Sequence, residues 1–109
     1  VCSSDLHYAQ EEMFIILEGS GTLRVAGEML PIVSGDVIFI PPGPEYPHQI
    51  INTSDAPLKY LSVSTREQPE LVMYPDSGKY QAMARGADGQ QVRYLQRPST
   101  SLDYWQDEP

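Results

Sequence analysis

Proline and glycine divide this sequence into short apolar runs, and this division does most to limit the folds open to the chain. Ten prolines and eight glycines are spread over 109 residues. The runs between them are rich in β-forming residues, and no segment shows a convincing helical period. The stretch Pro41-Pro42-Gly43-Pro44 excludes both a helix and a central strand at that point. The pattern predicts an all-β protein with tight turns.

The individual strands can be placed from the same runs. We expect them at residues 13–17, 22–26, 37–40, 48–52 and 58–64. The break at Gly19-Ser20-Gly21 predicts that the first two runs form a β-hairpin. Phe14, Ile16, Phe39 and Ile50 are expected in the core, and Asp36 is expected to bond to backbone in a turn. Short strands at near-regular spacing indicate a sandwich or a barrel.

Length and charge exclude several classes of function. A chain of 109 residues allows one domain. Its 15 acidic and 7 basic residues give a formal charge of −8, which argues against binding to nucleic acid or to anionic membrane surfaces. The single cysteine, Cys2, excludes an internal disulfide. No transmembrane run or secretory signal is visible, so a cytoplasmic location is the expectation.

The character of the sequence changes after Thr65. Residues 66–109 are more polar, contain proline and show weak periodicity. We interpret residues 7–65 as the core of the domain. Residues 66–109 are then a C-terminal extension that packs on this core or on a partner subunit, or is partly disordered.

The two histidines of the chain lie where a metal site would need them. His7 precedes the first apolar run, Glu12 opens that run, and His48 opens a later one. Alternate residues of a strand share a face, so Glu12 and His48 meet if both of their faces point inward. Two imidazoles and a carboxylate suit Mn, Fe, Zn, Ni or Co ions. Taken alone, either histidine is better interpreted as a surface or structural residue than as a metal ligand.

These residues, taken with the glycines and prolines around them, resemble the two motifs of the cupin superfamily. The first motif is matched by His7, Glu12 and Gly19, and the second by Gly35, Pro41, Gly43, His48 and Asn52, with two extra residues between Gly43 and His48. The resemblance implies a jelly-roll β-barrel whose metal is held by three histidines and one glutamate. His7, Glu12 and His48 match three of these ligands, and the position of the first histidine is taken by Asp5.

Residues 1–6 are hypothesised to be non-native. The sequence Val-Cys-Ser-Ser-Asp-Leu back-translates to a string that matches the end of a widely used sequencing adapter. The expected first ligand is missing at this junction, and cupin barrels normally have strands before the first motif. We therefore expect a barrel that lacks its N-terminal strands, with Asp5 as a weaker candidate ligand.

The resemblance also suggests functions. The stretch from Tyr74 to Lys79 is similar to single-domain bacterial cupins described as sugar-phosphate isomerases, which implies a metal-dependent, isomerase-like enzyme acting on a small polar metabolite. An Fe(II) or Ni(II) dioxygenase and a non-catalytic ligand-binding or sensor domain are the alternatives. A homodimer is expected by the same resemblance. Candidate pocket residues are Phe14, Tyr46, Ile50, Asn52 and Tyr60.

Overall fold

The prediction of an all-β chain is confirmed. A computed structural model describes residues 4–98 and 101–109, so Cys2 and half of the segment 1–6 lie outside the described residues. Where the chain is described it forms strands and turns, without a helix that could span a membrane. The strands are β1 (Leu6–His7), β2 (Glu12–Glu18), β3 (Ser20–Val25), β4 (Glu28–Val33), β5 (Val37–Ile40), β6 (His48–Ile51), β7 (Lys59–Ser64), β8 (Glu70–Tyr74), β9 (Lys79–Arg85) and β10 (Gln91–Gln96).

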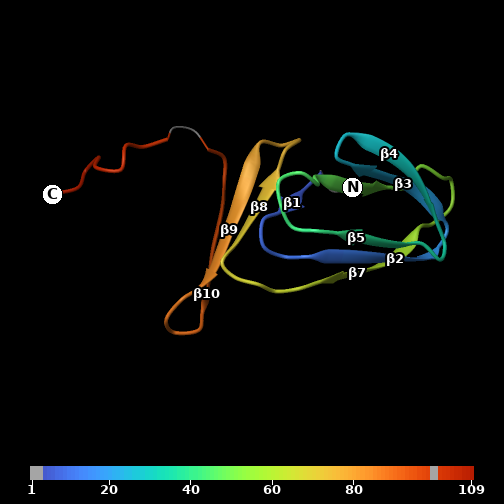
Figure 1. Ribbon diagram of the computed structural model, residues 1–109, viewed down its shortest axis with the longest axis horizontal. Helices are drawn as coiled ribbons and strands as arrows, with labels where there is room; N and C mark the ends of the chain where they lie inside the picture. Colours follow the sequence, from blue (N-terminus) through green and yellow to red (C-terminus); the bar gives the residue numbers. More distant parts are fainter. Residues whose placement is uncertain (1–3, 99–100) are drawn as a thin grey trace.

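The strands form three antiparallel sheets. Their orders are β5-β2-β7, β4-β3-β6 and β1-β8-β9-β10. The first two sheets face each other as layers, and the third stands at one end of them (Figure 1). Two facing antiparallel sheets, with the chain crossing repeatedly between them, are consistent with a jelly roll.

Alternation along the strands places the core between the two facing sheets. On β2, Phe14 and Ile16 are 7% and 1% exposed, whereas Leu17 is 51% exposed. Ile16 packs against Leu23 and Ile32 of the opposite sheet. Partly buried side chains surround this cluster, namely Val25, Ile38, Ile50 and Leu58. The sheets are thus held together by apolar burial rather than by hydrogen bonds between them.

The predicted hairpin between the first two runs is wrong. Strand β2 pairs with β5 and β7, while β3 pairs with β4 and β6. Between them Gly19 has a φ of +89°, and a Cβ at this position would lie 2.3 Å from the Pro57 carbonyl oxygen. This close approach lets the chain cross from one sheet to the other. The hairpin that does form joins β3 to β4 through Ala26 and Gly27, both at positive φ.

The placement of Phe39 in the core is also wrong. Its side chain is 56% exposed, and its neighbour Ile40 is 5% exposed. Phe39 pairs with Met13 on the outer face of the β5-β2-β7 sheet, because the register of β5 turns Ile40 inward.

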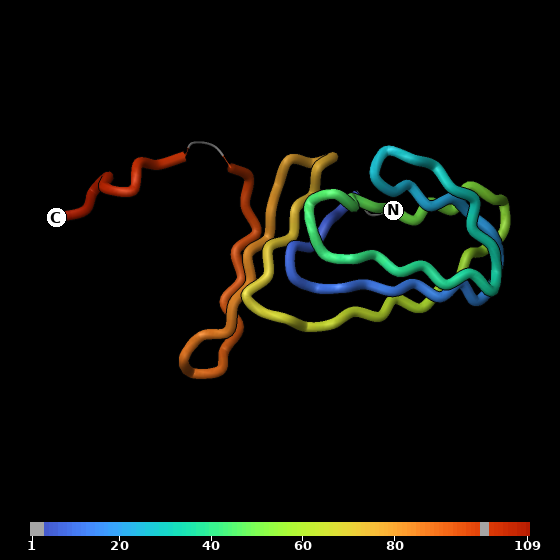
Figure 2. Tube along the Cα trace, in the orientation of Figure 1, coloured from blue at the N-terminus to red at the C-terminus, as the bar shows by residue number. Residues whose placement is uncertain are grey.

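The segment after residue 65 contributes strands that the sequence did not reveal. Strand β8 pairs with β1, and β9 and β10 extend the same sheet. In the turn between β8 and β9, Asp76 accepts a hydrogen bond from the Ser4 amide and pairs with Arg24 of β3. Residues 101–109 extend away from the sheets (Figure 2). Contact of this tail with a partner subunit stays a prediction.

Candidate metal centre

The candidate ligands come from three strands that the fold brings to one point. His7 ends β1, Glu12 opens β2 and His48 opens β6. Asp5 joins them because its backbone pairs with His48, the amide of each residue donating to the carbonyl of the other at 3.1 and 2.9 Å. Glu12 and His48 were expected to meet across the facing sheets, and Glu12 Oε1 and His48 Nε2 do approach each other there.

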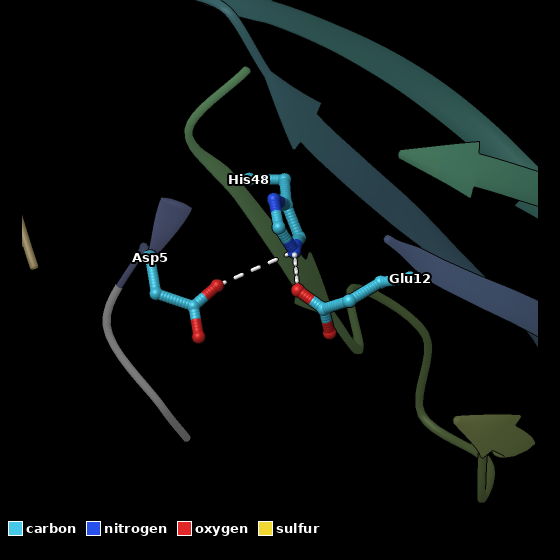
Figure 3. Close-up of side chains that lie close together, drawn as sticks. All are labelled: Asp5, Glu12 and His48. Carbon is cyan, nitrogen blue, oxygen red and sulfur yellow. Dashed lines mark ion pairs between the residues drawn. The ribbon is translucent and has the colours of Figure 1, made fainter. Parts of the chain in front are cut away.

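The side-chain distances define a compact cluster. Glu12 Oε1 lies 2.9 Å from His7 Nε2 and 3.1 Å from His48 Nε2. Asp5 lies on the other side, with Oδ1 3.3 Å from His48 Nε2 and Oδ2 3.8 Å from His7 Nε2. Figure 3 shows the Asp5 and Glu12 carboxylates approaching the same ring nitrogen of His48. One ligand atom each from Asp5, Glu12 and His48 lies within 4.8 Å of the others.

The donor set fits a divalent cation. Glu12 Oε1 and His48 Nε2 are buried, and among the described residues neither forms a hydrogen bond of acceptable geometry despite their short separation. Buried polar atoms without partners are costly, and atoms aimed at a shared point are suited to holding an ion. Two imidazole nitrogens and two carboxylates match the preferences of Mn, Fe, Co, Ni and Zn ions.

The contacts within the cluster shift the pKa values of His7, Glu12 and His48. Burial opposes charge on His7, but contact with Asp5 and Glu12 outweighs it and raises the pKa of His7 to about 10. Burial likewise opposes charge on Glu12, yet contact with His48 and His7 lowers the pKa of Glu12 to about 2. For His48 burial is again outweighed, chiefly by Glu12, and its pKa is raised. A divalent cation bound here would replace the histidine protons that face Glu12 and would supply the positive charge in their place.

Backbone and ring contacts fix the orientation of His48. Its Nδ1 lies 3.0 Å from the Tyr46 carbonyl oxygen, so Nδ1–H donates there and Nε2 faces Glu12. The Phe14 ring lies 5.7 Å from the His48 ring and 5.9 Å from that of Tyr60. The buried Phe14 ring therefore lies directly beside the cluster, between His48 and Tyr60.

The structure distributes the predicted pocket residues over different environments. Phe14 lies beside the cluster, and Tyr46 and Tyr60 are 39% and 42% exposed. Ile50 packs against the core. Asn52 follows β6 in a turn. Its side-chain Nδ2 donates to the Ala56 carbonyl, and its Oδ1 accepts from the Ser54 amide. Contact of any of these residues with a substrate stays a prediction.

The motif glycines and proline shape the loops around the cluster. Gly35 has a φ of +95° in the turn before β5, where Asp36 accepts a hydrogen bond from the Val33 amide as expected. Pro41 begins the loop after β5, and in that loop the Gly43 amide donates to the His7 carbonyl at 2.7 Å. This bond ties the proline-rich loop to a candidate ligand.

Two features of the region were not found from the sequence. Glu70 opens β8 with a fully buried side chain, and its Oε2 lies 3.2 Å from His7 Nδ1. A pocket of about 220 Å³ opens nearby, lined by Glu11, Glu12, Met13, Phe39, Val63, Ser64 and Thr65. No sequence motif marks Glu70 or the residues that line this pocket. Glu70 stands in the segment interpreted as an extension, and the pocket depends on the pairing of three strands.

Comparison with known proteins decides the family. Residues 2–64, more than half of the chain, match the cupin domain family. The chain belongs to the cupin family. An uncharacterized protein from Methanocaldococcus jannaschii is 43% identical over 58 residues, which are 53% of this chain and 45% of that protein.

Two solved structures share the fold of this cupin. One is a cupin-superfamily sugar phosphate isomerase from Silicibacter pomeroyi, with a TM-score of 0.76, 28% identity, and coverage of 94% of this chain and 62% of that one. The other, from Acidithiobacillus ferrooxidans, carries a provisional name as a sugar phosphate isomerase. Its TM-score is 0.71 at 27% identity, over 84% of this chain and 56% of that one. The cupin described here therefore spans between about half and two thirds of the length of the relatives it matches.

Proposed function

We propose that this cupin binds one divalent metal ion through His7, Glu12 and His48, with Asp5 at a fourth position, and acts as a metal-dependent, isomerase-like enzyme on a small polar metabolite. The observation that carries the proposal is the convergence of two imidazole Nε2 atoms on one oxygen of Glu12, at 2.9 and 3.1 Å. Structural similarity to two proteins named as sugar phosphate isomerases supports the reaction class.

The metal would supply a Lewis acid that draws electron density from a substrate oxygen. The residues of this chain would define the space around it. Glu12 acts in this proposal as a ligand and not as a base, since both histidines contact the same oxygen. Phe14 excludes water on the interior side, and the Asp5 side chain, 32% exposed, marks the side from which a substrate would approach.

The charges of the barrel favour a substrate without a phosphate group. Arg24 is paired with Asp76, and Lys59 with Glu18 at 3.1 Å. Recognition of a phosphate normally draws on arginine or lysine side chains, and each of these two already has a carboxylate partner. A neutral polar metabolite therefore fits the barrel better than a sugar phosphate.

Metal binding is the first test of the proposal. The wild-type chain should bind Mn, Fe, Co, Ni or Zn with one ion per chain by elemental analysis and calorimetry. His48→Ala should lose the metal while far-UV circular dichroism shows that the strands remain. Full metal retention by folded His48→Ala would contradict the proposal.

Turnover is the second test. The loaded protein would be incubated in D₂O with panels of free sugars and of sugar phosphates, and followed by proton NMR. Metal-dependent interconversion with deuterium incorporation at the carbon next to the carbonyl supports an isomerase. Saturable ligand binding without turnover would instead support a non-catalytic binding or sensor domain.

A dioxygenase is the second candidate, favoured by one observation. His7, Glu12 and His48 together are two histidines and one carboxylate, the set used by many non-haem Fe(II) oxygenases. Oxygen uptake by the Fe(II)- or Ni(II)-loaded protein with diketones or thiols would favour this candidate over an isomerase.

A homodimer and a cytoplasmic location remain part of the proposal. The outer face of the β5-β2-β7 sheet supports the dimer, because Val37, Phe39, Leu61 and Val63 are 62%, 56%, 50% and 46% exposed on β5 and β7, the two strands that flank β2. Contiguous apolar surface of this kind is typical of interaction sites. Light scattering should report twice the chain mass, and Phe39→Ser should shift it toward the monomer.

A further inference from the structure

Glu70 is a buried carboxylate with an unusually complete set of donors. Its residue is 4% exposed and its side chain fully buried. Oε1 accepts hydrogen bonds from the amides of Tyr8 at 3.1 Å, Ala9 at 2.8 Å and Leu71 at 2.8 Å. Oε2 accepts one from the Gln10 amide at 2.9 Å and faces His7 Nδ1 at 3.2 Å. The partners of the carboxylate are thus four backbone N–H donors and one imidazole nitrogen that can carry a hydrogen.

Three of these donors belong to the loop that separates two candidate ligands. Tyr8, Ala9 and Gln10 lie between His7 at the end of β1 and Glu12 at the start of β2. Their amides converge on Glu70, which lies 60 to 62 residues further along the chain. The loop is thus wound around one carboxylate, and that carboxylate fixes where β1 ends relative to β2.

The contact with His7 decides what the ring can do. A carboxylate has no proton to donate, so the hydrogen of this contact sits on Nδ1 of His7. The opposite nitrogen, Nε2, then faces Glu12 Oε1 at 2.9 Å and Asp5 Oδ2 at 3.8 Å. Histidine ligands commonly donate their second ring N–H to a carboxylate, which fixes the tautomer and the orientation of the ring.

We propose that Glu70 is the positioning residue of the metal centre: it holds His7 as an Nδ1–H donor and fixes the loop of residues 8–10, so that His7 presents Nε2 to the metal. The inference rests on the metal-binding function proposed above. It adds the β8 strand, outside the two cupin motifs, to the machinery of the site. His48 obtains the same orientation from the Tyr46 carbonyl, so each imidazole has its own acceptor.

Glu70→Gln tests the proposal with little change in shape. The amide oxygen can keep the bonds from Tyr8, Ala9 and Leu71. The amide nitrogen then faces both His7 Nδ1 and the Gln10 amide, and the hydrogen bond from Gln10 is lost. This nitrogen donates, so Nδ1 must accept and the ring hydrogen moves to Nε2, where it blocks the metal. We expect zinc affinity to fall about 10–100-fold by calorimetry. Glu11→Gln is the matched control, because it removes the same charge from an exposed residue of the same loop.

A double-mutant cycle separates positioning from a merely structural role. If Glu70 acts through His7, Glu70→Gln should lower zinc affinity in the wild type but add little in a His7→Ala background. Equal losses in both backgrounds, or a loss no greater than that of Glu11→Gln, would overturn the proposal. If Glu70→Gln does not fold, Glu70→Asp keeps the charge and is tested in the same cycle.

A spectroscopic measurement keeps this inference separate from metal binding itself. Long-range ¹⁵N–¹H spectra of the wild type should show an exchange-protected Nδ1–H of His7, with or without zinc, and Glu70→Gln should lose it. If the wild type shows this signal but binds no metal, the metal function fails while the Glu70–His7 contact stands. If the signal is absent from the wild type, the positioning role is overturned.

Discussion

Glu12 Oε1 lies 3.1 Å from His48 Nε2, although the two residues open strands of different sheets. Strand β2 belongs to the β5-β2-β7 sheet and β6 to the β4-β3-β6 sheet. The contact therefore joins the two facing sheets at one end, next to the buried Phe14 ring. The metal binding proposed above would therefore be coupled to the packing of the two sheets through this pair.

Glu12→Gln should weaken zinc binding by about 10-fold or more, because an amide replaces the oxygen on which both histidines converge. Glu11→Gln removes the same charge one residue away on an exposed side chain. Isothermal titration of both variants makes the comparison. Similar affinities for the two variants would show that Glu12 is not a ligand.

The metal-free protein should lose stability as the pH rises from about 6.5 to 10. The pKa of His7 is raised in the folded state, from 6.5 to about 10, so its contribution is complete below pH 6.5 and is lost through pH 10. The pKa of Glu12 is lowered from 4.5 to about 2, so its contribution is lost as the pH falls through that range. Urea unfolding with a chelator present measures both limbs.

His7→Gln provides the control for this pH dependence. It should reduce the alkaline limb without abolishing it, because the pKa of His48 is also raised in the folded state. An alkaline limb of the same size in wild type and His7→Gln would show that His7 does not carry it.

Ile16→Ala should lower the free energy of unfolding by about 2–5 kcal/mol, because it opens a cavity between the two facing sheets. Its neighbour Leu17 is 51% exposed, and Leu17→Ala should change the stability by less than about 1 kcal/mol. Chemical denaturation of the two variants tests the inward and outward faces of β2. Equal losses would mean that the strand is placed one residue out of register.

Gly19→Ala should be more damaging than Gly27→Ala. Both glycines have positive φ, but a Cβ at Gly19 would lie 2.3 Å from the Pro57 carbonyl oxygen, whereas one at Gly27 meets nothing within 4 Å. We expect about 1 kcal/mol for the backbone strain at Gly27 and a larger loss at Gly19. Thermal unfolding of the two variants checks the order.

The origin of residues 1–6 can be tested at the level of DNA. Sequencing the source DNA upstream of the His7 codon should reveal a histidine codon two positions before it, in place of Asp5. If the codons for Val1 to Leu6 are native, Asp5 is a true member of the cluster, in keeping with its 3.3 Å approach to His48. Zinc affinity of Asp5→Asn would then measure its contribution.

The sequence by itself predicted the all-β class, five of the strands and three residues of the candidate site. Short apolar runs bounded by glycine and proline are local signals, and a two-residue period assigns Glu12, Phe14 and Ile16 to one face without any tertiary information. The cupin resemblance then supplied the family, which the match over residues 2–64 shows.

Only the tertiary structure decided which strands pair and what surrounds the site. Gly19 carries the chain to the opposite sheet instead of into a hairpin, because its contact with Pro57 depends on residues almost forty positions away. Phe39 faces outward because its register with Met13 is set between strands. Glu70 reaches His7 only after β8 pairs with β1. Each of these depends on long-range pairing, which a local sequence period does not encode.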